Sequence, residues 1–158
     1  MRRVVVTGIG TINSTGHNVK DSFKAVVDGV CGIDTITLFD ASEFSVKIAG
    51  EVKDFDPTTV MDKKEVKKAD RFIQLGIKAA LEAMIDSGYV TQEDKKVDAS
   101  IADRFGMISG SGIGGLSTIE RNSIVCETKG SRKVSPFFIP SSLANMLSGF
   151  ISIEHNLR

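Results

Sequence analysis

A glycine-rich run holds the residues of this chain that are best suited to bind a ligand through the backbone. It reads Ser109-Gly110-Ser111-Gly112-Ile113-Gly114-Gly115, and it lies between an apolar run at residues 105–108 and a helical pattern. A strand, a glycine turn and a helix in this order are typical of a ligand site in an α/β protein. Glycine lets the backbone approach a ligand closely, and the first amides of a helix are free to bind it. The run therefore predicts a site at the start of the helix.

One candidate ligand is a dinucleotide, because Gly110-x-Gly112-x-x-Gly115 matches the glycine fingerprint of such sites. A dinucleotide-binding unit continues into a second strand that ends in an acidic ribose ligand. Here the helix leads instead into a basic connection and the proline-bracketed residues 134–140. A second partial match at residues 7–10 lacks its third glycine, because Asn13 stands there. Nucleotide binding stays an alternative, and we predict no cofactor.

Four further side chains are of types that act as nucleophiles or metal ligands. Cys31 and Cys126 form no CxxC pair, and His17 and His155 have no partner at the spacing of a zinc site. The sequence therefore predicts no metal centre. Two unpaired cysteines without a secretion signal favour reduced thiols and a cytoplasmic protein.

Length and charge limit the class of protein. A chain of 158 residues corresponds to one domain and is long enough to bury a core. Lys plus Arg and Asp plus Glu number 20 each, so no bulk charge attracts nucleic acid or an anionic membrane. The apolar runs are shorter than the ~20 residues of a membrane span. We expect no nucleic-acid partner and no membrane association.

The hydrophobic pattern predicts the elements that position these residues. The clearest helix covers residues 63–87, where apolar side chains recur every three or four positions before Gly88 stops the helix. Two prolines predict an extended loop at 134–140. The other predicted helices cover residues 18–28, 116–128 and 141–151, the last of them in the interior, and the predicted strands cover 3–9, 45–52 and 105–108.

The first turns of the helix at 63–87 carry a basic face. Lys64, Lys67, Lys68 and Arg71 share one side of it. Cations near a helix N-terminus oppose the helix dipole, so this placement does not serve helix stability. The face is either solvated or a docking patch for an acidic partner.

Four motifs together indicate a family. They are the glycine pair after the valine strand at 4–10, the run 109–115, the segment Ser-Pro-Phe-Phe-Ile-Pro at 135–140, and the small-residue helix after it. In this order and spacing they resemble the elongating, type II β-ketoacyl-acyl-carrier-protein synthases, and the similarity runs from Arg3 to Arg158. The resemblance implies an α/β, thiolase-like fold of α/β/α/β/α layers. Residues 1–158 would form its N-terminal half, and the full-length enzyme would be a homodimer.

The resemblance also implies a reaction, the decarboxylative Claisen condensation of an acyl thioester with malonyl-acyl carrier protein in fatty acid synthesis. This chemistry needs an activated cysteine thiolate and two histidines. In the family these residues follow the position of Arg158. None of Cys31, Cys126 and His155 matches them. We therefore assign no catalytic residue, and we expect the 158-residue chain to be truncated before the nucleophile and inactive alone.

Several positions match functional residues of the family. Ile113 matches the floor of the acyl tunnel, and Phe138 matches the aromatic that reaches across the dimer interface; core packing is the alternative for both. The residues that match the docking face for acyl carrier protein are Lys64, Lys67, Lys68, Arg132 and Lys133. A different class of function stays open, namely a non-catalytic carrier-protein-binding or chain-length-factor-like module.

Overall fold

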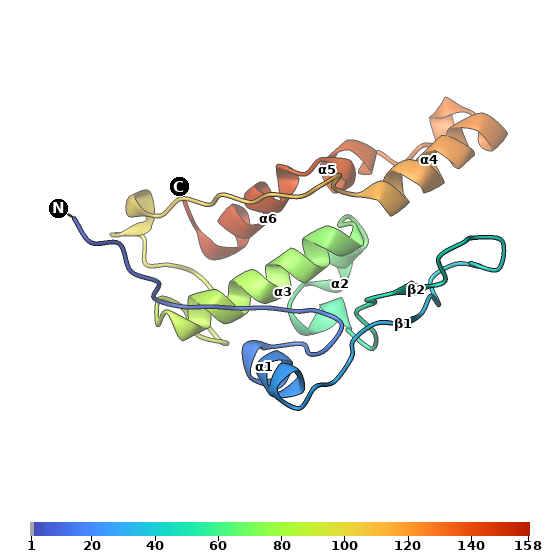
Figure 1. Ribbon diagram of the computed structural model, residues 1–158. Helices are drawn as coiled ribbons and strands as arrows, with labels where there is room; N and C mark the ends of the chain where they lie inside the picture. The colour runs from blue at the N-terminus through green and yellow to red at the C-terminus, as the bar shows by residue number, and fades with distance from the viewer. Residues whose placement is uncertain (1) are drawn as a thin grey trace.

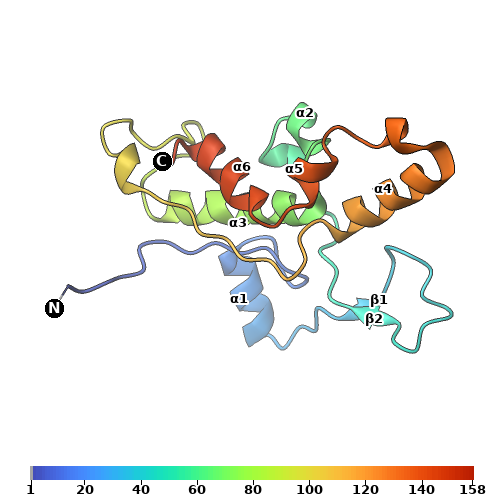
Figure 2. The ribbon, with the colours of Figure 1, turned by 90° about the horizontal axis from the view of Figure 1, so that it is seen from above.

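The computed structural model describes residues 2–158. Helices α3 and α6 lie side by side, and α4 extends beyond them (Figure 1). A small hairpin projects on the other side of α3 (Figure 2). In chain order the elements are α1 (Val19–Val27), β1 (Asp34–Thr35), β2 (Ile48–Ala49), η1 (Pro57–Thr59), α2 (Lys63–Val66), α3 (Arg71–Asp86), η2 (Ala102–Arg104), α4 (Leu116–Lys129), η3 (Ser131–Lys133), α5 (Phe138–Ser142) and α6 (Met146–His155).

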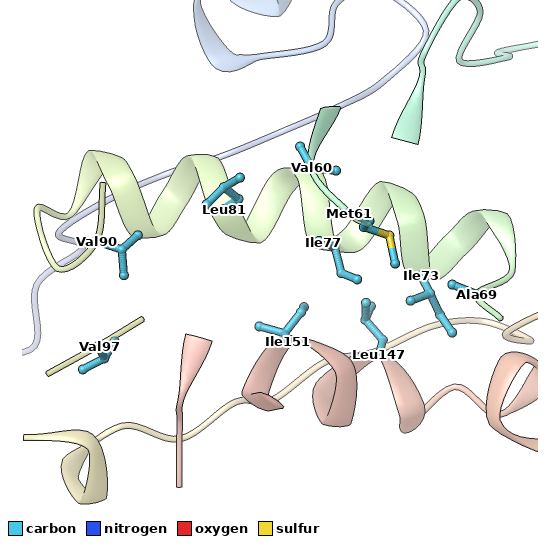
Figure 3. Close-up of a cluster of buried hydrophobic side chains, with 10 residues drawn as sticks. All are labelled: Val60, Met61, Ala69, Ile73, Ile77, Leu81, Val90, Val97, Leu147 and Ile151. Carbon is cyan, nitrogen blue, oxygen red and sulfur yellow. The ribbon is translucent and has the colours of Figure 1, made fainter. Parts of the chain in front are cut away.

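The core lies between α3 and α6. One apolar row of α3, formed by Ile73, Ile77 and Leu81, is buried. Leu147 and Ile151 of α6 point toward this row (Figure 3). A Cβ on Gly76 would lie 2.5 Å from Leu147 Cδ1, so this glycine lets the two helices approach closely. Burial of each such side chain stabilises the fold by about 1.5–3 kcal/mol. The apolar row predicted from the sequence is confirmed.

The single helix predicted at residues 63–87 is wrong, because the chain forms two helices there. Asp70 has an extended backbone (φ −66°, ψ 163°), and its side chain accepts a hydrogen bond from the Phe72 amide, so it is the N-cap of α3. An N-cap residue satisfies amides that a continuous helix would bond internally. The short α2 therefore ends before α3 begins.

The strands predicted at residues 3–9 and 105–108 are wrong for the described chain. Both segments are extended, but neither forms a ladder, and the side chains of Val4 and Ile108 are 96% and 95% exposed. A strand needs a neighbouring strand to bond its backbone groups, and within residues 2–158 no strand pairs with either segment. Of the strand predicted at 45–52, only Ile48–Ala49 pairs, antiparallel to Asp34–Thr35.

The N-terminal segment lies directly on α3 instead (Figures 1 and 2). A Cβ on Gly8 would lie 2.3 Å from the Ala83 carbonyl oxygen, and one on Gly10 would lie 2.0 Å from that of Ala79. The Ile9 amide donates to Asp86 Oδ2 at 2.9 Å, and the Thr11 amide to Glu82 Oε2 at 3.1 Å. These glycines serve backbone contact with a helix, so the segment is not a phosphate loop.

The predictions for the remaining helices and for the proline-bracketed loop are partly confirmed. The helices predicted at 18–28 and 116–128 are confirmed as α1 and α4. The extended loop predicted at 134–140 is wrong in its second half, because Phe138 begins α5; Pro140 is tolerated there, since the first turn of a helix needs no donor. The last helix begins later than predicted, because Leu143 is extended and separates α5 from α6. Its interior position is confirmed for Leu147 and Ile151.

Adding one methyl group at Gly10 will test the close contact with α3. We expect Gly10→Ala to lower the free energy of unfolding by about 1–3 kcal/mol, because the new Cβ meets rigid backbone. Gly106→Ala is the matched control, since a Cβ there has nothing within 4 Å. Urea denaturation of both variants measures the difference. Equal stability of the two variants would contradict the contact.

Exposed carboxylates hold the hairpin of β1 and β2. The Lys53 ammonium bonds Asp34 at 2.8 Å, and it lowers the pKa of that carboxyl, as does the Thr35 amide. The hydroxyl and the amide of Thr37 both donate to Glu51 and lower its pKa. A lowered folded-state pKa contributes stability above the unfolded-state pKa, and this contribution is lost as the pH falls through the folded-state pKa.

We therefore expect the hairpin to loosen in acid, below the ordinary carboxyl pKa of about 4. Amide hydrogen exchange at Thr37 will accelerate relative to the intrinsic rate as the pH is lowered. Glu51→Gln keeps an acceptor that does not titrate, so exchange at Thr37 in this variant will depend less on pH. A pH-independent Thr37 amide in the unmodified chain would exclude this role of Glu51.

Candidate functional site

The glycine-rich run divides into two parts with different surroundings. Gly114 (φ +88°) and Gly115 lie against α5, where added Cβ atoms would stand 2.4 Å from the Ser142 and Ser141 carbonyl oxygens. The Gly115 amide donates to Ser142 O at 2.9 Å. Cβ atoms at Gly106, Gly110 and Gly112 would meet nothing within 4 Å. The end of the run therefore joins the start of α4 to α5. At its beginning the hydroxyl of Ser109 is hydrogen-bonded to that of Ser148 on α6 at 2.6 Å, and the glycines between these contacts lie open.

Two amides at and just before the start of α4 are already bonded to protein side chains. The Gly114 amide donates to Ser111 Oγ at 2.9 Å, and the Thr118 amide donates to Asp70 Oδ2 at 3.0 Å. A phosphate at this helix start would have to displace a buried carboxylate of the same charge. This arrangement opposes the dinucleotide interpretation of the run.

The two candidate tunnel residues lie on the joined segments. Ile113 stands at the turn before α4 with its side chain 64% exposed, so it takes no part in the core of the described chain. Phe138 is the first residue of α5 and is half-buried. The hydroxyl of Ser142 bonds the Phe138 carbonyl oxygen. The hydrogen bond from Gly115 to Ser142 therefore links the turn that holds Ile113 to the helix that begins with Phe138. We refer to this turn and α5 together as the hydrogen-bonded unit.

Asn122 and Asp70 support this unit, and neither was identified from the sequence. Buried Asn122 donates to Thr118 O at 2.8 Å and accepts from the Ser135 amide at 3.0 Å, so it ties α4 to the segment before α5. Asp70 precedes an apolar helical pattern, which is a recognised N-cap signal. The continuous helix predicted at 63–87 masked this signal.

Most of the candidate docking cations are free. Lys64 and Lys67 are exposed, as are Arg132 and Lys133 on η3, and within residues 2–158 none of these four lies within 4.0 Å of a carboxylate. Lys68 differs, because it pairs with Glu65 at 2.6 Å and lies 5.4 Å from the centre of the Phe137 ring. This contact brings the segment after α2 against the segment after η3.

Helical spacing in the sequence placed Arg71 on the predicted basic face, but in the structure its guanidinium binds other parts of the chain. Its guanidinium donates to the carbonyl oxygens of Val52 and Phe55, at 3.3 and 3.2 Å, and lies 5.0 Å from the Phe55 ring centre. It therefore braces the chain before η1 rather than facing a partner.

The cysteines and histidines form no catalytic pair within residues 2–158. Cys31 and Cys126 are exposed and free. His17 Nε2 is hydrogen-bonded to Lys53 O at 2.8 Å, and fully buried His155 places Nδ1 2.6 Å from Lys95 O. Neither imidazole bonds a thiol, and the same part of the chain contains no group of three acidic, cysteine or histidine side chains arranged for a metal ion.

Comparison with known proteins shows the family of this chain. The model of the β-ketoacyl synthase N-terminal domain matches residues 1–158, so this chain belongs to the β-ketoacyl synthase family. It is 48% identical to 3-oxoacyl-[acyl-carrier-protein] synthase 2 of Vibrio harveyi over 99% of this chain and 36% of that protein. The chain thus spans about a third of the length of the curated relatives it matches.

Solved structures show the same fold. The ishigamide ketosynthase/chain length factor matches with a TM-score of 0.80 and 28% identity, over 99% of this chain and 38% of that one. A ketosynthase solved with its type II PKS acyl-carrier protein and bound to a hexaketide matches with a TM-score of 0.78 and 26% identity, over 100% and 41%. The thiolase-like α/β fold predicted from the motifs is therefore confirmed, although the predicted strands at residues 3–9 and 105–108 are unpaired within residues 2–158.

None of the helices in residues 2–158 is both long enough and apolar enough to span a membrane.

Proposed function

We propose that this chain is the N-terminal part of an elongating condensing enzyme, which joins an acyl thioester to malonyl-acyl carrier protein in cytoplasmic fatty acid synthesis. The observation that carries the proposal is the match of residues 1–158 to the β-ketoacyl synthase N-terminal domain. Its relatives at 41–48% identity are named 3-oxoacyl-[acyl-carrier-protein] synthase 2, which supports this substrate class.

The proposed reaction needs residues that lie beyond Arg158 in the family. A cysteine thiolate attacks the acyl thioester carbonyl and expels the carrier-protein sulfur as a thiolate, which takes a proton from solvent and leaves the acyl group on the enzyme. Malonyl-carrier protein then loses CO₂, and the resulting enolate carbon attacks the acyl-enzyme and releases the cysteine. Two histidines stabilise the developing negative charge on oxygen. Residues 1–158 contribute the tunnel and the docking face.

A homodimer would complete the tunnel, with Phe138 of one protomer reaching toward the tunnel of the other. Exposed apolar side chains on and next to α4 and α5, two helices that pack on each other, are available for such a contact. Ile124 of α4 is more than half exposed, as is Ile139 of α5, and Leu143 is only slightly less exposed. A patch of exposed apolar side chains is a feature of protein–protein interfaces.

The docking face would receive acyl carrier protein. The cations of this face lie on two short helical segments, α2 and η3, with Lys67 and Lys68 just after α2. Four of them have no acidic partner within residues 2–158, so they are available to an acidic surface. The complex of a related ketosynthase with its acyl-carrier protein supports this kind of partner.

A second candidate function is a chain-length-factor-like subunit without a nucleophile of its own. It is favoured by the likeness to the ishigamide ketosynthase/chain length factor. The gene sequence after codon 158 separates the two functions, because a Thr-Ala-Cys motif there supports the enzyme and a replaced cysteine supports the subunit.

Condensation by the full-length protein tests the proposed function. We expect it to form the β-ketoacyl product from acyl- and malonyl-carrier protein. In the double variant Lys64→Glu, Lys67→Glu, reversed charges oppose docking, so KM for malonyl-carrier protein will rise roughly tenfold with kcat nearly unchanged. Lys47→Glu is the control, since Lys47 is an exposed cation outside the docking face. Absence of product from the unmodified protein would refute the function.

Side-chain bulk at Ile113 will test the tunnel assignment. We expect Ile113→Phe to lower kcat/KM for long acyl chains roughly tenfold or more while short chains react normally, because overpacking costs about 1–3 kcal/mol. Ile153→Phe on α6 is the control, since Ile153 is also exposed. An equal loss for all chain lengths would contradict the assignment.

A further inference from the structure

The carboxylate of Asp70 is buried between two helices. The residue is only 9% exposed. Its Oδ1 accepts from the Phe72 amide at 3.4 Å, and its Oδ2 accepts from the Thr118 amide at 3.0 Å. Within residues 2–158, no Lys, Arg or His nitrogen lies within 4.0 Å of it, and the guanidinium of the adjacent Arg71 points to other acceptors. One side chain thus bonds the first turns of both α3 and α4.

Two helix N-termini compensate this buried charge. Each helix start carries the equivalent of about half a positive charge, and its first amides lack partners within the helix. Gly115, the N-cap of α4, has no side chain with which to bond those amides. Asp70, at the start of α3, therefore supplies the cap that α4 lacks, and it links the two helices through Thr118, which lies 48 residues further along the chain.

This link sets the position of the candidate tunnel residues relative to the core. A Cβ on Gly115 would stand 3.1 Å from the Asp70 Cβ, so the end of the glycine run lies against the carboxylate-bearing residue. Ile113 lies two residues earlier, and Gly115 is hydrogen-bonded to α5, which begins with Phe138. Displacement of the first turn of α4 would therefore move both.

We propose that Asp70 is a positioning residue for the acyl tunnel, which holds Ile113 and Phe138 in register with α3 through the start of α4. The proposal rests on the proposed function for the tunnel itself. Asp70 bonds backbone amides and would act through Ile113 and Phe138, so its effect falls on which acyl chains are accepted.

Two substitutions separate this role from local capping of α3. Asp70→Ser keeps a good N-cap for α3 but is too short to reach Thr118. Asp70→Asn keeps the length and one acceptor oxygen for Thr118. Asp62→Ser is the control, because Asp62 is the N-cap of α2 and forms no side-chain cap bond.

In the full-length protein we expect Asp70→Ser to make amide exchange at Thr118 roughly tenfold faster and to broaden the distribution of product chain lengths. Asp70→Asn will largely keep the slow exchange at Thr118 and the narrow distribution of product lengths. Asp62→Ser will change neither the exchange nor the product lengths. If the serine variant does not fold, the asparagine variant decides the outcome, with a smaller shift in the same direction expected.

Unchanged product lengths in a folded Asp70→Ser variant would overturn the positioning role, as would unchanged exchange at Thr118. Failure of the proposed function looks different, because the unmodified protein would then form no condensation product. Thr118 exchange reports on the link between α3 and α4 in either case.

Discussion

Helix α3 is the surface against which the rest of the molecule is placed. Its apolar row packs on α6, its carboxylates Glu82 and Asp86 hold the amides of the N-terminal segment, and Asp70 at its start reaches α4. These contacts occupy different parts of one rigid helix. The position of the candidate site therefore depends on α3, although neither Ile113 nor Phe138 belongs to this helix. A shift of α3 would move the candidate tunnel residues and the core together.

The glycine pattern shows what local sequence determines and what it leaves open. Glycine is required wherever a Cβ would collide, and the collision partner can be a phosphate or a neighbouring backbone. At Gly8 and Gly10 the partner is α3, and at Gly114 and Gly115 it is α5. The residue type predicts close approach correctly in each case. It does not identify the approaching group, which depends on contacts between segments far apart in the chain.

The same distinction separates the correct element predictions from the wrong ones. The rows of α3 and the extent of α4 follow from local periodicity, so the sequence was sufficient for them. The valines at residues 4–6 have strong strand propensity, but a strand also requires a lateral partner, and the described chain provides none. The role of Asp70 likewise depends on Thr118, 48 residues away. The family and its fold came from four motifs in order, because their spacing carries information that a single motif lacks.

The exposed surface of this chain is larger than that of a compact monomer of the same mass. The chain exposes 11,094 Å², whereas a compact monomer of its mass exposes about 7,700 Å². The excess is several times the roughly 800 Å² that one partner buries in a standard interface. Large apolar side chains contribute to it, since Val4 and Ile108 are almost fully exposed and Val6 is mostly exposed. Such an extent of apolar surface is stable in water only when other protein covers it. The unpaired extended segments and the exposed side chains of α4 and α5 therefore share one requirement, which is contact with other protein.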